Sequence, residues 1–186
     1  MAKTLFGGLV GGFALYLIGF LFWGTPLSLL AFNRIEEPQA AALQLALAQT
    51  LTSGGTGTYA IPSPGSANGS VLYGKGPIAT IHYNISGFPV VDTSAMLQGL
   101  ILALITGILI ALAMGAVGNR VIDFASRARI AILFALGTTL YTVLGQPIFN
   151  HFGWGYWVYL FFSQFLGLAV CGLIVARWFL PRTALG

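Results

Sequence analysis

This chain contains very few charged residues. Only 6% of its 186 residues are Asp, Glu, Lys or Arg, and 57% are hydrophobic. A soluble domain typically carries about 25% charged residues. The chain has too few charged residues to form the hydrated surface of a soluble protein, and we expect lipid to surround most of it. The net charge of +4 comes from basic residues scattered singly between apolar segments, so we expect no nucleic-acid partner.

Cysteine and histidine are also scarce. The one cysteine, Cys171, excludes an internal disulfide and a CxxC metal or redox site. The two histidines, His82 and His151, lie outside the apolar stretches, and no cysteine–carboxylate set accompanies them. We therefore predict neither a cofactor nor a metal, and we leave a bound lipid open.

Four long apolar stretches indicate membrane-spanning helices. Each is about long enough to cross a hydrocarbon core of roughly 30 Å as an α-helix. The first is longer than the apolar part of a typical secretory signal, and no clean cleavage site follows it. We expect an uncleaved anchor. The stretches are Leu5–Trp23, Met96–Val117, Ile130–Ile148 and Tyr156–Arg177.

The charges between the stretches predict an orientation. With four spans, six of the eight Lys and Arg residues fall on one side, and only Arg34 and Lys75 fall on the other. Positive charge marks the cytoplasmic side of a membrane. We therefore predict a bacterial inner-membrane protein with both termini cytoplasmic and residues 24–95 extracytoplasmic. The six cytoplasmic charges are Lys3, Arg120, Arg127, Arg129, Arg177 and Arg182.

Small residues recur at every fourth position in the spans. This spacing keeps them on one helix face, where another helix backbone can approach closely. Ala131, Ala135 and Thr139 give the third span a similar row. The partner helix is either internal to the bundle or belongs to another subunit. The predicted packing residues are Gly7, Gly8, Gly11, Gly12, Gly99, Ala103, Gly107, Ala111, Gly115, Ser163, Gly167 and Cys171.

The segment between the first two spans has a different composition. Proline and two acids open a predicted helix at 36–51, which Gly54 and Gly55 end. Residues 57–62 and 78–85 are predicted strands, the second from its alternation. Residues 63–76 are rich in Gly, Ser, Pro and Asn and predict a loop. Residues 25–32 either prolong the first span or lie along the interface. We predict an anchor at 1–32, a small α+β cap at 33–95 and a three-helix region at 96–186.

Polar side chains within the spans are few. Coupled transporters usually need ionisable groups inside the membrane, and the middles of these spans have none. The polar candidates are Gln164, Thr138, Thr139 and Thr142; Gln164 favours an interhelical hydrogen bond, or else it lines a pathway. On the cytoplasmic connection, Asp123 and Arg127 form an i,i+4 pair, which we expect to lie in a solvated turn.

The order of parts resembles a group of small bacterial integral membrane proteins. The resemblance rests on Gly57, Tyr59 and Pro62, which form a GxYxxP stretch, followed by Gly76-Pro77 and a β-like run. It implies one N-terminal span, an extracytoplasmic segment and three further spans. It implies no catalytic residue.

These features predict an all-α integral membrane protein with a small α+β cap between helices 1 and 2. We expect a non-catalytic accessory or assembly subunit of a larger membrane complex, respiratory or photosynthetic in type, that contacts lipids and other subunits or itself. A small transporter or channel component is the alternative. An enzyme is a weaker third hypothesis. The only side chains that could supply its chemistry are those of His82, His151, Asp92, Glu36 and Glu37.

Overall fold

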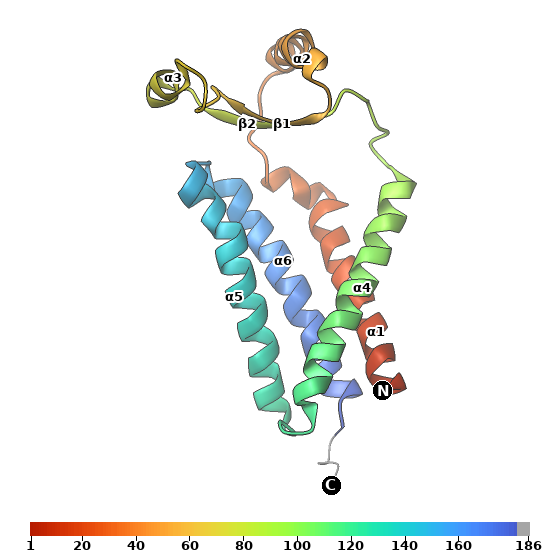
Figure 1. Cartoon of the computed structure of the whole chain (residues 1–186). Coiled ribbons are helices and arrows are strands. Elements are labelled where there is room, and N and C mark those ends of the chain that lie inside the picture. Colours follow the sequence, from red (N-terminus) through yellow and green to blue (C-terminus); the bar gives the residue numbers. More distant parts are fainter. Residues whose placement is uncertain (182–186) are drawn as a thin grey trace. The chain divides into compact units, whose positions relative to one another are not determined.

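The computed structural model describes residues 1–181 and is mostly helical (Figure 1). Four of its helices are long and apolar enough to cross a membrane, as the sequence predicts. They are longer than the apolar stretches because their polar ends, such as Thr93 and Ser126, are also helical. Arg182, counted in the charge bias, lies outside the described residues. The four helices are α1 (Ala2–Trp23), α4 (Thr93–Gly118), α5 (Phe124–Asn150) and α6 (Trp154–Ile174), the last continued by a π-helical turn over Val175–Phe179.

The connection between α5 and α6 is shorter than the sequence suggested. The last two apolar stretches leave residues 149–155 between them, but α5 continues to Asn150 and α6 begins at Trp154. His151 ends α5 in the left-handed conformation, with φ of 55°, and such a residue commonly terminates a helix. Pro147 lies inside α5. The two helices therefore join through three residues only.

The chain divides into two compact units, Arg34–Asp92 and the remainder. The smaller unit holds α2 (Glu37–Leu51), β1 (Gly57–Ile61), α3 (Gly69–Lys75) and β2 (Ala79–Tyr83). Helix α2 and both strands lie where the sequence predicts them. The prediction of a loop over 63–76 is wrong for its second half, where α3 forms. The surrounding Gly, Ser and Pro residues obscured its one short apolar run, 71–73.

The two strands of the smaller unit form an antiparallel hairpin. Tyr59 lies opposite Ile81, and Thr58 lies opposite His82. The Thr58 hydroxyl and His82 Nδ1 are 3.0 Å apart, and the Tyr59 hydroxyl donates to the Gly55 carbonyl at 2.7 Å. These local bonds hold the hairpin together without a large apolar core.

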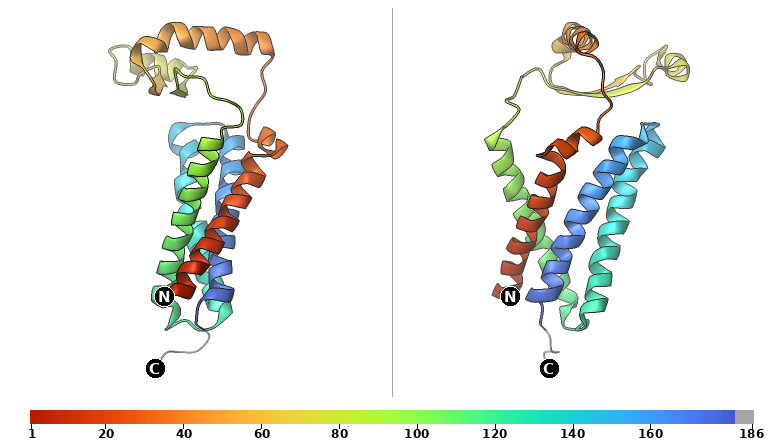
Figure 2. Two further views of the ribbon diagram at one scale, coloured as in Figure 1. Left: turned by 90° about the vertical axis from the view of Figure 1, so that its right-hand side faces the viewer. Right: turned by 180° about the vertical axis from the view of Figure 1, so that it is seen from behind.

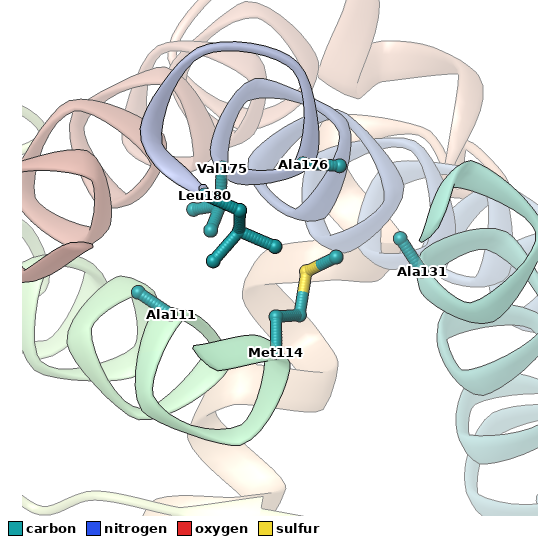
Figure 3. Close-up of a cluster of buried hydrophobic side chains, with 6 residues drawn as sticks. All are labelled: Ala111, Met114, Ala131, Val175, Ala176 and Leu180. Carbon is teal, nitrogen blue, oxygen red and sulfur yellow. The ribbon is translucent and has the colours of Figure 1, made fainter. Parts of the chain in front are cut away.

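The membrane unit, the larger of the two, is built around α1. Seen from behind, α1 lies between α4 and α6, and α5 lies beyond α6 (Figure 2). A short 3-10 helix, Pro26–Leu30, follows α1 as a separate element. A buried cluster lies where α4, α5 and the end of the last helix meet (Figure 3). It consists of Ala111, Met114, Ala131, Val175, Ala176 and Leu180.

Candidate functional site

The two glycine pairs of α1 pack against different neighbours. Gly8 and Gly12 face α4: a Cβ built on Gly12 would lie 2.5 Å from the Ala103 carbonyl oxygen, and one on Gly107 would lie 2.5 Å from the Gly12 nitrogen. No real Cβ is accommodated at such distances. The absence of side chains here is what lets the two backbones touch.

The other pair, Gly7 and Gly11, faces the last helix. A Cβ on Gly11 would lie 2.8 Å from the Cys171 sulfur, and one on Gly7 would overlap the Phe179 side chain. Offset by one residue, the two pairs lie on adjacent faces of α1, since each residue turns the helix by about 100°. Helix α1 is therefore wedged between α4 and α6.

The remaining small residues continue these contacts. A Cβ on Gly99 would lie 3.8 Å from Tyr16, one on Gly115 would lie 3.3 Å from Thr4, and one on Gly167 would lie 2.6 Å from Leu15. Ala111 is fully buried. The small-residue rows thus pack against helices of the same chain.

An aromatic cluster joins the C-terminal end of α1 to the N-terminal half of α6. The Trp23 indole N–H donates to the Ser163 hydroxyl at 3.0 Å, and the Tyr159 hydroxyl donates to the Phe22 carbonyl at 2.5 Å. The Trp23 and Tyr159 rings meet edge to face, with centroids 5.1 Å apart. Ser163 is therefore an acceptor across 140 positions as well as a small packing residue, a pairing that no local pattern reveals.

Among the described residues, the four polar residues predicted within the spans form no hydrogen bond between their side chains. Thr139 is buried and donates to the Ala135 carbonyl at 2.7 Å, and Thr142 donates to the Thr138 carbonyl at 2.7 Å. Gln164 is exposed. It lies one helical turn before Leu168, on the same face of α6. Within residues 1–181 its amide makes no hydrogen bond, so the interhelical bond expected of Gln164 is not formed among these residues.

An apolar groove lies between α4, α5 and α6. Helices α4 and α5 meet at their connecting turn and diverge away from it (Figures 1 and 2). The space between them has a volume of about 420 Å³, a typical size for a ligand site. Its lining contains no charged side chain, and its only hydroxyls are Thr106 and Thr138. The lining residues are Thr106, Leu109, Ile110, Ala113, Met114, Val117, Ile130, Ala131, Phe134, Ala135, Thr138, Leu168 and Gly172.

Arg127 closes the end of the bundle next to this groove. The side chain is only 2% exposed and donates to three backbone carbonyls, those of Val121, Gly118 and Pro181, at 2.5, 2.7 and 2.6 Å. The Gly118 carbonyl belongs to the open end of α4, where a cation is favourable. Arg127 therefore ties α4, α5 and the C-terminal segment together.

This arrangement corrects the expectation of a solvated Asp123–Arg127 turn. The hydrogen bonds of Arg127 go to carbonyls, whereas the Asp123 carboxylate accepts the Ser126 N–H at 2.8 Å and caps α5. That bond, with a smaller contribution from the Arg127 charge, lowers the pKa of Asp123 below its usual 3.8. The i,i+4 spacing suggested a surface pair, but the packing of the C-terminal segment over Arg127 buries its guanidinium.

The two candidate histidines lie in different units of the chain. His82 is paired with Thr58 in the hairpin, and His151 ends α5. Within residues 1–181, no three His, Cys, Asp or Glu side chains group so as to hold a metal ion.

No protein-family model, curated protein or solved structure matches this chain. Its function is therefore inferred from its own residues and geometry.

Proposed function

We propose that this protein is a non-catalytic accessory or assembly subunit of a larger membrane protein complex. It is held in a bacterial inner membrane by its four apolar helices, with both termini in the cytoplasm and residues 24–95 outside. The six-to-two distribution of Lys and Arg supports this orientation. Its partner is another membrane subunit that reaches out of the bilayer on the side of the Arg34–Asp92 unit.

The observation that carries the proposal is the missing core of the smaller unit. In Arg34–Asp92, all of which the structure describes, Gly69 is the only buried residue. Leu43 and Leu45 of α2 are 53% and 60% exposed, and Phe88 is 65% exposed. A unit this small buries too little surface to be stable alone, and exposed apolar patches mark interaction sites.

The absence of charge sharpens the nature of the partner. No charged residue occurs between Glu37 and Lys75, a segment that includes all of α2 after its first residue. Surfaces that face water permanently carry charges, whereas the centres of protein interfaces are depleted of them. Helix α2 therefore offers an apolar surface for a partner of matching apolar character.

Photo-crosslinking tests this proposal. A photoreactive residue is placed at position 45 of the full chain, expressed in its native membrane, and the crosslinked products are identified after solubilisation in mild detergent. We expect one discrete protein adduct. In separate preparations without the photoreactive residue, Leu45→Lys should prevent the same partner from co-purifying. Gln44→Lys adds the same charge to the neighbouring position of α2 and serves as the matched control, which we expect to retain the partner.

Two results would overturn the proposal. One is a chain that runs alone as a monomer, with no co-purifying protein. The other is a partner lost equally with Leu45→Lys and Gln44→Lys, because the apolar surface of α2 would then have no part in binding.

A further inference from the structure

We propose that the groove between α4, α5 and α6 holds one acyl chain of an anionic phospholipid, with the lipid phosphate at the α4–α5 turn. This inference requires only that the four long helices lie in a membrane. It is independent of the accessory role, because the groove belongs to the membrane unit and the partner surface belongs to Arg34–Asp92.

The lining of the groove suits hydrocarbon. Leu109, Ala113 and Phe134 present aliphatic and aromatic surface, and the lining contains no charged side chain. The Thr106 hydroxyl donates to the Leu102 carbonyl of its own helix at 2.9 Å, so it leaves little unmet polarity in the groove. At the depth of a bilayer core, such a surface favours an apolar chain over water.

The length of the groove matches one leaflet. On α4 the lining runs from Thr106 to Val117, a helical rise of about 16 Å at roughly 1.5 Å per residue. This is about half of the roughly 30 Å hydrocarbon thickness of a bilayer. The groove therefore spans the depth of a single acyl chain, beginning at the α4–α5 turn.

The charge at the turn selects the headgroup. Arg120 is exposed, and its backbone N–H bonds the carbonyl of Val117, which lines the end of the groove. In the described part of the chain the Arg120 side chain makes no hydrogen bond or ion pair. The one acid of the turn, Asp123, is engaged as the cap of α5, and Arg127 is bound to carbonyls. Arg120 is thus the guanidinium available for a phosphate, and basic sites between membrane helices commonly bind anionic lipids.

Native mass spectrometry of the full chain in detergent tests the site. Phosphatidylglycerol and phosphatidylcholine with identical chains are titrated separately. We expect phosphatidylglycerol to bind about fivefold more tightly, since one arginine near an anionic lipid contributes about 1 kcal/mol. Arg120→Gln should abolish this preference. Arg129→Gln removes the same charge from the face of α5 that helical periodicity places opposite the groove, and it should preserve the preference.

A second pair of variants tests the chain in the groove. Ala113→Phe fills the groove, and we expect binding of both lipids to fall. Leu112→Phe places the same ring at the neighbouring position, outside the lining, and should leave binding unchanged. Three results would overturn the proposal: equal affinities for the two lipids, undiminished binding by Ala113→Phe, or full competition by inorganic phosphate, which would indicate an anion site without an acyl chain.

Discussion

Gly107 of α4 lies against Gly12 of α1 at backbone contact. A Cβ built on Gly107 would be 2.5 Å from the Gly12 nitrogen and 2.6 Å from its Cα. Both residues are buried. The two helices thus meet at the point where neither has a side chain. Their backbones can touch only because both residues are glycine.

Replacing Gly107 with alanine should therefore separate the helices. We expect Gly107→Ala to lower the free energy of unfolding in detergent by about 1–3 kcal/mol, the usual cost of overpacking. Gly137→Ala is the matched control, because a Cβ there meets nothing within 4 Å. It should be neutral or stabilising by about 0.5–1 kcal/mol through helix propensity. Equal effects of the two variants would contradict this packing.

Arg127 should be the least replaceable of the basic residues. Arg127→Gln leaves the carbonyls of Gly118, Val121 and Pro181 without their donor, and we expect a loss of about 2–4 kcal/mol in thermal or denaturant unfolding. Arg127→Lys should not restore it, because an ammonium group lacks the fork of donors. Arg129, which is exposed, provides the control: Arg129→Gln should cost little. Similar losses for both residues would show that the net charge matters rather than the hydrogen bonds of Arg127 to the three carbonyls.

Trp23 and Ser163 should be energetically coupled. Trp23→Phe keeps an aromatic ring and removes the indole N–H, and Ser163→Ala removes the acceptor of the 3.0 Å bond. In a double-mutant cycle we expect a coupling of about 0.5–1.5 kcal/mol in the free energy of unfolding. Strictly additive losses would mean that the hydrogen bond contributes nothing and that the cluster is held by ring packing alone.

Asp123 should make the stability of the protein depend on acid pH. The Ser126 backbone N–H lowers the pKa of Asp123 in the folded protein, so the folded state favours the carboxylate. Its contribution is fully present above the unfolded pKa, near 3.8, and is lost as pH falls through the lower folded value. Asp123→Asn retains a capping oxygen and removes this titration. Between about pH 5 and 2 the free energy of unfolding should therefore fall more steeply with decreasing pH in the wild type than in Asp123→Asn. The same pH dependence in both proteins would contradict the prediction.

Much of the fold follows from the sequence because local pattern suffices for it. A run of apolar residues such as those after Met96 is long enough to span a bilayer whatever surrounds it. The four long helices, α2 and the two strands were therefore predictable. Helix α3 was not, since a single turn of apolar residues among Gly, Ser and Pro gives no clear period. The ends of α5 were not either, because its polar first turn carries no hydropathy signal.

The candidate site shows where local pattern stops. Repeats of Gly and Ala predicted close helix contacts, but only the folded chain pairs Gly12 with Gly107 and Gly11 with Cys171. A single i,i+4 spacing suggested a solvated pair at Asp123 and Arg127. The fold instead buries Arg127 beneath Pro181, 54 positions away.

The sequence by itself indicated a membrane protein and gave the number of its long apolar helices, because hydropathy and length are properties of each segment alone. Only the tertiary structure decided which glycine faces which helix, that Arg127 binds carbonyls, and that α4 and α5 diverge to leave an apolar groove. These features depend on contacts between residues far apart in the chain, and such contacts form only once the helices have packed.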